Sequence, residues 1–251
     1  MLEHLKQVQI RFNKASKSYD DVASVQRDSA EFLVYKLLKH QNFIPKTVLD
    51  LGTGTGYITE LLLKEFPKSS FYLNDIADDM IETCKAKFAK TTNIYYLPGD
   101  MIDLDNDLYE CVISNFALQW APDLHYSINF LHSKSSDVFA FSILLDGTFE
   151  EWENIINKYQ TIKIMNYPKA EELINLCNRL KSHDQIFEFW LMDFPLSFDN
   201  PKAFMSYLQL LGASASSNLV HLSNLRKLLK EQHNNLIVTY KVFFGIFSMR
   251  S

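Results

Sequence analysis

The stretch Thr47-Val-Leu-Asp-Leu-Gly-Thr-Gly-Thr-Gly56 decides the fold, because an apolar run leads directly into three glycines at alternate positions. Short apolar runs of this kind are typical of buried strands. Gly52, Gly54 and Gly56 allow the chain to turn sharply and a ligand to approach the backbone. A helical pattern follows from Tyr57 to Phe66. Strand, glycine loop and helix in this order predict a nucleotide-binding loop, although glycines can also serve a tight turn alone.

Helix-like and strand-like patterns alternate on both sides of this loop. A helix is predicted over Val25 to His40, and later helices near 79–88 and 123–132. The predicted strands after the loop cover 70–75, 93–97, 109–115, 137–145, 186–196 and 236–247. Alternation of this kind predicts an α/β fold, a doubly wound Rossmann-like sheet of seven mostly parallel strands.

The pattern changes after Asp146. Thr148 to Glu151 reads as a capping box that opens one helix, and Tyr167-Pro168 places a proline at the start of another. These two helices predict a helical cap inserted after strand five, and further helices are predicted from Pro201 and over 220–231. Without a linker-like segment, we expect one domain over 1–251. Its parts would be an N-terminal helical lid (1–40), a cofactor-binding core (41–145), the cap (146–182) and C-terminal strands and helices (183–251).

Composition excludes several classes of protein. The 251 residues are 47% hydrophobic and 22% charged, with a net charge of −5, which argues against nucleic acid and anionic membranes as partners. The three cysteines lack CxxC spacing, which disfavours a disulfide framework and a metal site. No apolar run approaches the ~18 residues of a membrane span. We expect a cytoplasmic monomer without a metal.

Acidic and amide side chains follow the later strands, where open α/β sheets bind ligands. Asp75 closes the second strand 19 residues after Gly56, where a carboxylate can accept from both ribose hydroxyls of an adenosine. Asp100 could accept from an adenine amino group while Met101 packs on the ring, or it could simply serve a turn after Gly99. Asn115 ends the fourth strand. Because the loop is GxGxG without Gly-Lys-Ser/Thr, the predicted ligand is a nucleoside without phosphates.

These motifs resemble those of class I S-adenosylmethionine-dependent methyltransferases. In that family the glycine loop approaches the methionine end of the cofactor, the acidic residue after strand two binds the ribose, and the one after strand three meets the adenine. The usual Pro-Gly-Gly before strand five is replaced here by His132-Ser-Lys-Ser-Ser136. The resemblance implies S-adenosyl-L-methionine as cofactor, S-adenosyl-L-homocysteine as product, and these cofactor contacts: Tyr19, Arg27, Asp50, Gly52, Thr53, Gly54, Gly56, Asp75, Ile76, Asp100, Met101, Asn115 and Gln119.

Three further stretches narrow the resemblance. Phe12-Asn-Lys-Ala-x3-Tyr19-Asp20 with Gln26-Arg27, Ser114 to Trp120, and Thr239 to Gly245 are similar to malonyl-acyl-carrier-protein O-methyltransferases of biotin synthesis. That family implies methyl transfer to the free carboxylate of a malonyl thioester on acyl carrier protein. Two other readings stay open: a methyltransferase acting on another small acid or a quinone precursor, and a methyltransferase-like assembly factor that transfers no methyl group.

A carboxylate acceptor sets the chemistry that the site must supply. With a pKa near 4 it is already ionised at neutral pH, so no general base is needed. Its charge disappears as the ester forms, which favours a poorly hydrated pocket. Tyr19, Phe116 and Trp120 are the expected catalytic walls, with ordinary packing as the alternative. Arg27 could pair with the methionine carboxylate, and Gln119 could contact the cofactor or cap a helix.

Carrier docking would need local cations, because acyl carrier protein is acidic and so is this chain. Two clusters qualify, and both are also consistent with ordinary solvated faces: Arg226, Lys227 and Lys230, and in the cap Lys158, Lys163, Lys169, Arg179 and Lys181. We expect these cations to hold the carrier. Weaker donors should hold the malonyl carboxylate, because a cation on the attacking oxygen would stabilise the ground state more than the transition state.

Overall fold

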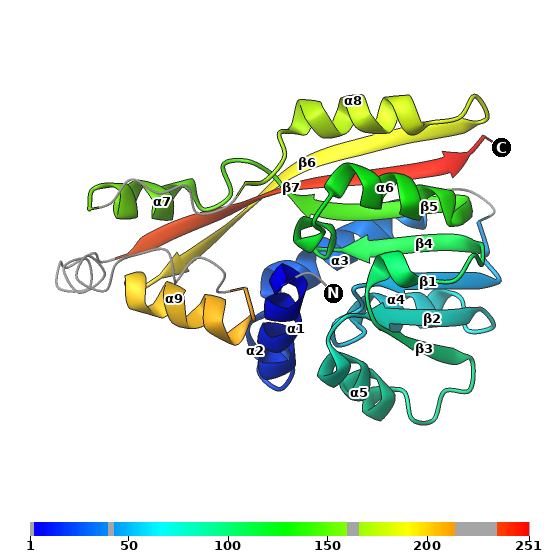
Figure 1. The fold of residues 1–251 in the computed structure, drawn as a ribbon, viewed down its shortest axis with the longest axis horizontal. Coiled ribbons are helices and arrows are strands. Elements are labelled where there is room, and N and C mark those ends of the chain that lie inside the picture. Colours follow the sequence, from blue (N-terminus) through cyan, green and yellow to red (C-terminus); the bar gives the residue numbers. More distant parts are fainter. Residues whose placement is uncertain (1–2, 40–42, 160–165, 214–234, 251) are drawn as a thin grey trace.

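The sheet has seven strands in the order β3-β2-β1-β4-β5-β7-β6 (Figure 1). The computed structural model describes residues 3–39, 43–159, 166–213 and 235–250. Neighbouring strands from β3 to β5 pair in parallel, and β7 is antiparallel to both β5 and β6. The predicted α/β fold class is therefore confirmed. The strands are β1 (Thr47–Leu51), β2 (Ser70–Asp75), β3 (Ile94–Pro98), β4 (Tyr109–Asn115), β5 (Ser135–Leu144), β6 (Gln185–Phe198) and β7 (Leu236–Met249).

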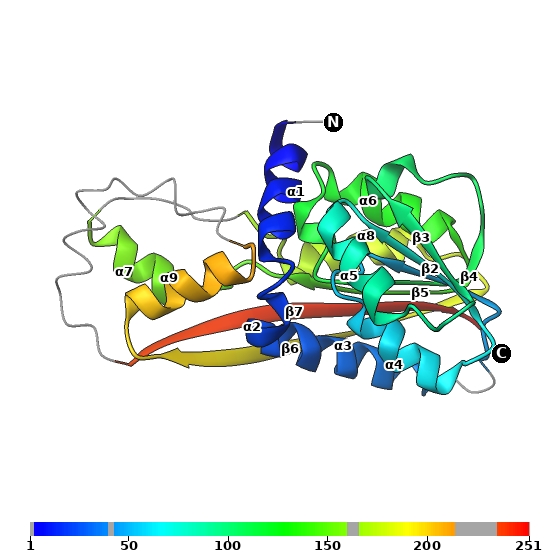
Figure 2. The same cartoon turned by 90° about the horizontal axis from the view of Figure 1, so that it is seen from below.

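Helices cover both faces of the sheet (Figure 2). α3 (Ser24–Leu37) and α4 (Tyr57–Glu65) pack on one face, α6 (Leu124–Ser133) and α8 (Ala170–Leu180) pack on the other, and α5 (Asp78–Lys87) packs against β2 and β3. The central strands are buried on both faces, as their apolar runs predicted. The remaining elements are α1 (Glu3–Ala15), α2 (Tyr19–Val22), α7 (Glu150–Asn157), α9 (Pro201–Leu210) and two short 3-10 helices, η1 (Met101–Asp103) and η2 (Leu118–Trp120).

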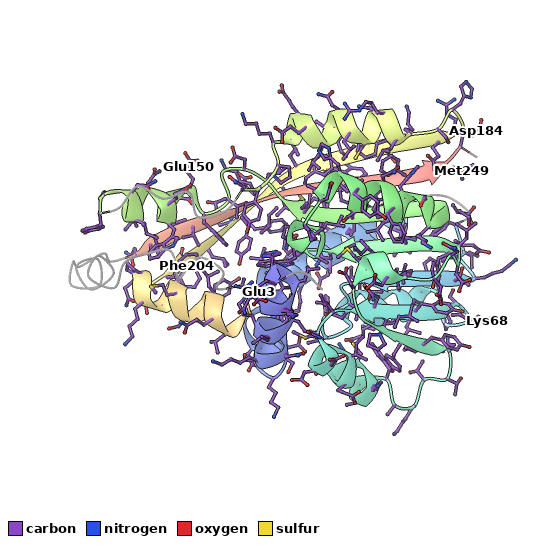
Figure 3. The ribbon with its side chains drawn as sticks, viewed as in Figure 1. Glu3, Lys68, Glu150, Asp184, Phe204 and Met249 are labelled. Atoms are coloured by element: carbon purple, nitrogen blue, oxygen red, sulfur yellow. The ribbon has the colours of Figure 1, made fainter. Side chains whose placement is uncertain are left out.

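The strands β6 and β7 extend beyond β5 as a two-stranded ribbon. From Leu236 to Lys241, β7 pairs with β6 alone, and from Val242 to Ser248 it pairs with β5 as well. Helices α7 and α9 pack at the free end of this ribbon, where Phe204 contacts Trp152 at 5.4 Å between ring centroids. Figure 3 shows Glu150 and Phe204 at this end and Asp184 and Met249 at the other.

The predicted capping box at Thr148 to Glu151 is wrong. Phe149 occupies the N-cap of α7 with a left-handed φ of 61°, and no side chain caps the helix. The Thr148 hydroxyl instead donates to the Lys241 carbonyl oxygen, and the Glu151 carboxylate accepts from the amide and hydroxyl of Thr239. Both side chains therefore join α7 to β7.

The two predicted cap helices exist, but they lie in different places. α7 packs against β7, whereas α8 packs against α6 and β6 on a face of the sheet. The proline at Pro168 precedes α8 rather than starting it, because the helix begins at Ala170 with Lys169 as its N-cap. The helix predicted from Pro201 is confirmed as α9. The helix predicted over 220–231 lies outside the described residues, and none of the described helices is long and apolar enough to cross a membrane.

Candidate active site

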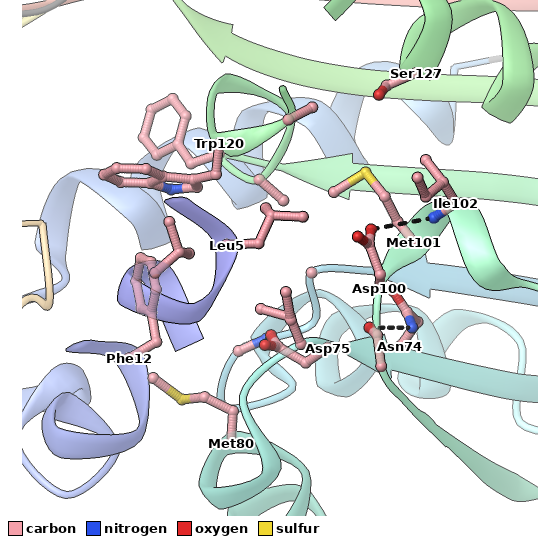
Figure 4. Close-up of a pocket in the computed structure, with 18 of the residues that line it drawn as sticks. Leu5, Phe12, Asn74, Asp75, Met80, Asp100, Met101, Ile102, Trp120 and Ser127 are labelled. Carbon is pink, nitrogen blue, oxygen red and sulfur yellow. Dashed lines mark hydrogen bonds between the residues drawn. The ribbon is translucent and has the colours of Figure 1, made fainter. Parts of the chain in front are cut away.

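A hollow that is open to solvent lies at the carboxyl ends of β1, β2 and β4. Leu5 and Phe12 of α1 lie on one side of it, and Asp100, Met101 and Ile102 on the other (Figure 4). We call it the adenosine hollow, because it collects the residues predicted to hold the nucleoside. Of the predicted cofactor contacts, these line it: Tyr19, Gly52, Gly54, Asp75, Ile76, Asp100, Met101 and Asn115.

The glycine loop is built so that only glycine fits. Gly52 and Gly54 have φ values of 64° and 55°, in the left-handed region that other residues rarely adopt. A Cβ on Gly52 would lie 2.2 Å from the Ala117 Cβ, so this glycine allows the loop to pack against the segment after β4. A Cβ on Gly54 would meet nothing within 4 Å. The structure thus leaves open space beside the backbone at Gly54.

Asp75 stands at the rim of the adenosine hollow with both carboxylate oxygens already engaged. The Gly54 amide donates to Oδ2 at 2.9 Å, and the Ala77 amide donates to Oδ1 at 2.8 Å. The side chain is only 8% exposed. Burial raises the pKa of Asp75 to about 6, and the backbone donors oppose this rise. Asp75 therefore joins the glycine loop to the end of β2 and still faces the ligand space.

Asp100 caps a short helix and also lines the adenosine hollow. Its carboxylate accepts a hydrogen bond from the Ile102 amide at 3.3 Å, which caps the short helix η1. The same residue lines the adenosine hollow together with Met101. Asn74 also lines the hollow, and its amide donates to the Leu97 and Gly99 carbonyl oxygens. We did not predict Asn74, although its position next to Asp75 at the end of a strand was a usable signal.

A second, smaller hollow lies on the other side of the glycine loop and has Arg27 in its wall. We call it the methionine hollow, and it is also lined by Asp20, Thr53 and Asp50. The Arg27 guanidinium donates to the Asp20 carbonyl oxygen. Asp50 is 1% exposed and accepts from the Thr53 and Thr59 hydroxyls at 2.9 and 2.6 Å. Burial raises the pKa of Asp50, and these bonds oppose the rise. The Asp50 carboxylate thus connects β1 to the glycine loop through Thr53 and to α4 through Thr59.

Asn115 is engaged by the protein through every polar atom of its side chain. The Ser29 and Ser142 hydroxyls each donate to its Oδ1 at 2.6 Å, and its Nδ2 donates to the Gln26 carbonyl oxygen at 3.0 Å. These bonds tie α3 to the ends of β4 and β5. Asn115 borders the adenosine and methionine hollows, but the contacts that the structure shows are internal.

A third hollow shares wall residues with the adenosine hollow, and we call it the acceptor hollow because it collects the residues predicted to surround the acceptor. The three predicted wall residues, Tyr19, Phe116 and Trp120, line both. None of the described residues that line the acceptor hollow is charged, and most are aromatic or aliphatic. Gln119 lies here rather than at the cofactor side, and its Nε2 donates to the Phe116 carbonyl oxygen at 2.6 Å.

Tyr19 alone, of the described residues, borders all three hollows. The adenosine and methionine hollows meet the acceptor hollow at this side chain. Sequence reasoning found Tyr19 but missed other residues of the acceptor hollow, which come from segments far apart in the chain: Gln26, Leu144, Phe149, Trp152, Tyr167, Leu208 and Tyr240. Gln26 and Tyr240 stood within the motifs that carry the family resemblance, and the others had no sequence signal that separates a pocket wall from a core.

Comparisons with known proteins agree with this geometry. A family model described as a methyltransferase domain matches residues 48–132. The malonyl-[acyl-carrier protein] O-methyltransferase of Neorickettsia risticii is 31% identical over 96% of this chain and 95% of its own length. The enzyme of the same name from Bacillus cytotoxicus is 30% identical over 84% of this chain and 76% of its own length.

Solved structures share the fold at low identity. The magnesium protoporphyrin IX methyltransferase of Synechocystis, solved with S-adenosylhomocysteine bound, superposes with a TM-score of 0.60 at 14% identity, over 92% of this chain and 86% of that one. This likeness shows only a shared fold, whereas the sequence identity and coverage of the two relatives above show the family. The chain belongs to the malonyl-[acyl-carrier protein] O-methyltransferase family of S-adenosylmethionine-dependent methyltransferases.

Proposed function

We propose that this protein transfers the methyl group of S-adenosylmethionine to the free carboxylate of a malonyl thioester carried on acyl carrier protein. One observation carries the proposal: Tyr19 borders the adenosine and methionine hollows and also the uncharged acceptor hollow. The names of the relatives supply the acceptor.

The residues present fit the cofactor. Gly54 leaves space for a ligand against the backbone, Asp75 offers a carboxylate at the rim, and Asp100 with Met101 lines the far side. Arg27 in the methionine hollow offers a cation for an amino-acid carboxylate. When bound, the cofactor supplies a methyl group activated by an adjacent sulfonium.

The acceptor hollow suits a nucleophile that loses its charge. A malonyl carboxylate is ionised at neutral pH, so no residue has to remove a proton before attack. Walls without charged groups hydrate the anion poorly, and this favours the neutral ester. Burial, followed by the nearby Tyr207 hydroxyl, raises the pKa of Tyr19, so its phenol stays protonated and serves as a wall and donor. Holding the carboxylate beside the methyl group supplies the rest of the rate.

An open surface groove shares one lining residue, Tyr167, with the acceptor hollow. Its other walls include Lys169 and the carboxylates Asp123, Asp146 and Glu172. A thioester on a long flexible arm needs a route from the surface to the acceptor hollow. Of the cations proposed to dock the carrier, Lys169 lines this groove, whereas Arg179 and Lys181 lie at the other end of α8. Lys163 and the cluster Arg226, Lys227 and Lys230 lie outside the described residues.

The proposal is tested by methyl transfer from labelled S-adenosylmethionine to malonyl-acyl carrier protein, with malonyl-coenzyme A and succinyl-acyl carrier protein as comparison acceptors. We expect a base-labile ester on the malonyl carrier, lost in Asp75→Ala and retained in Asp79→Ala, which removes an exposed carboxylate from the neighbouring helix. Cofactor binding without any acyl acceptor would favour the small-acid or assembly-factor readings. Absence of cofactor binding would refute the proposal.

A further inference from the structure

The acceptor hollow contains a small set of uncharged polar groups within its apolar walls. Tyr240 lines this hollow, and its hydroxyl lies 2.9 Å from the hydroxyl of Tyr207. Both residues are buried, with 2% of Tyr240 and 8% of Tyr207 exposed. Gln26 and Gln119 also line the hollow, and the Oε1 atom of each is buried without a hydrogen-bond partner among the described residues. A bound carboxylate must find its donors among these groups or among the hydroxyls of Tyr19 and Tyr167 and the indole N–H groups of Trp120 and Trp152, whose side chains also line the hollow, because burying an unpartnered anion is very unfavourable.

The donors in this set are tyrosine hydroxyls. The amide of Gln119 is oriented by its Nε2, which donates to the Phe116 carbonyl oxygen, so its free atom is an acceptor. The free atom of Gln26 is likewise an acceptor. Two such oxygens repel a carboxylate rather than hold it. The Tyr207–Tyr240 pair carries two protons and needs one for the bond between its oxygens. The Gln26 side chain also hydrogen-bonds to both hydroxyls and, against the larger effect of burial, lowers the pKa of each, as a donor does, so one tyrosine proton is left for a ligand.

We propose that the Tyr240 hydroxyl, oriented by a hydrogen bond from Tyr207, donates to the non-attacking oxygen of the substrate carboxylate and so distinguishes a malonyl from an uncharged acyl group. This inference rests on the proposed function and names the residue that reads the acceptor. Tyr240 is a specificity-determining residue because it touches the carboxylate, and Tyr207 is a positioning residue because it acts through Tyr240.

A neutral donor is the appropriate partner for this reaction. The carboxylate oxygen attacks the methyl carbon, the methyl–sulfur bond breaks with its electron pair going to sulfur, and both charges disappear. A cation would bind the starting anion more tightly than the transition state and slow the transfer. A phenol donates a weaker bond and gains nothing by ionising here, because burial raises the pKa of Tyr207 to about 12 and that of Tyr240 well above its usual value. The hydroxyl therefore remains a donor throughout the ordinary pH range.

The location of the pair agrees with this role. Tyr240 stacks on Phe116 at 6.3 Å between ring centroids, and Phe116 lines both the adenosine and the acceptor hollows. Tyr207 lies close enough to Tyr19 for its hydroxyl to contribute to the raised pKa of Tyr19, second to burial. The donor thus lies near the junction where the methyl group is delivered.

The test compares the affinities of the enzyme for two acyl groups, one ending in a carboxylate and the other in a methyl group. With S-adenosylhomocysteine bound, no transfer occurs, so the dissociation constants of malonyl- and acetyl-acyl carrier protein can be compared by titration. We expect Tyr240→Phe to reduce the preference for malonyl by about tenfold and to leave acetyl binding unchanged, because one hydrogen bond to a charged group is lost. The variant keeps the ring contacts with Phe116 and Phe149. Tyr109→Phe removes the hydroxyl of a buried residue elsewhere in the core and should keep the wild-type preference.

Tyr207→Phe gives an independent variant of the same test, with an expected loss of about threefold in the malonyl preference. It carries the test alone if Tyr240→Phe yields too little folded protein. An unchanged malonyl-to-acetyl ratio in both variants, or an equal loss for both ligands, would overturn the inference while leaving the proposed function intact. A wild-type protein that forms no ester on malonyl-acyl carrier protein would overturn both.

Discussion

We predict that Asp75 makes the affinity for the cofactor depend on pH. Its carboxyl group is buried and its pKa is raised to about 6 in the cofactor-free protein. The proposed hydrogen bonds from the ribose hydroxyls favour the ionised form, so cofactor binding should lower this pKa. Above pH 6 the group is already ionised and binding costs no proton. Below pH 6, binding must release the proton, and the affinity falls as the pH falls.

The size of the effect follows from the fraction of ionised carboxyl. At pH 5 about one molecule in eleven carries the carboxylate, so the apparent dissociation constant of S-adenosylhomocysteine should rise about elevenfold, or about 1.4 kcal/mol. At pH 7 the same factor is about 1.1. Titration calorimetry at pH 5.0, 5.5, 6.5 and 7.5, at constant ionic strength, measures the profile.

Asp75→Asn separates this group from other sources of pH dependence. The variant cannot ionise, so we expect weak binding with a flat profile between pH 5 and 7.5. Asp103→Asn removes an exposed carboxylate beside the hollow and should keep the wild-type profile. A flat wild-type profile, or the same slope in wild type and Asp75→Asn, would refute the role given to Asp75.

Three further predictions concern the same framework. Without cofactor, the raised pKa means that the stability contributed by Asp75 is fully present below pH ~4 and is lost as the pH rises through 6. Asp75→Asn should therefore raise the free energy of unfolding at pH 7.5 by about 1–2 kcal/mol, even after the Gly54 hydrogen bond is lost. A lower free energy of unfolding than that of the wild type, measured by urea denaturation, would contradict this. Gly54→Ala should lower cofactor affinity by about tenfold or more, because its methyl group enters the ligand space; unchanged calorimetric binding would show that the loop does not approach the cofactor. Asn115→Ala should destabilise the fold by about 2–4 kcal/mol, because Ser29, Ser142 and the Gln26 carbonyl lose their partner, and a loss below about 0.5 kcal/mol in chemical denaturation would reject that account.

Local sequence patterns predicted the parallel part of the sheet because its elements depend on neighbouring residues. The apolar run before Gly52 and the carboxylate at Asp75 have one plausible arrangement in an α/β fold, and the structure has it. The capping box failed for the opposite reason. Thr148 and Glu151 have the right spacing, but their hydrogen bonds go to β7, far along the chain. A local motif cannot show that a distant strand competes for the same groups.

The same limit applies to the site. Asp50 and Asn115 stand at the ligand-binding edge of the sheet, yet their polar atoms are satisfied by Thr53, Thr59 and the serines of other elements. The sequence places a polar side chain at an edge but does not say which partner it takes. Pocket walls are harder still, because a buried Trp152 or Tyr240 has the same sequence pattern as a core residue.

The ribbon of β6 and β7 has two halves under different structural constraints. Its sheet half is held by β5 in a register where a one-residue slip would move each side chain to the other face of the sheet. Its free half pairs with β6 alone, contributes Tyr240 to the wall of the acceptor hollow and carries the helices α7 and α9 beside it. Substitutions there can reshape what is methylated without disturbing the loop that holds the methyl donor. Proteins with this fold can therefore bind the same methyl donor and still differ in the acceptor that they methylate.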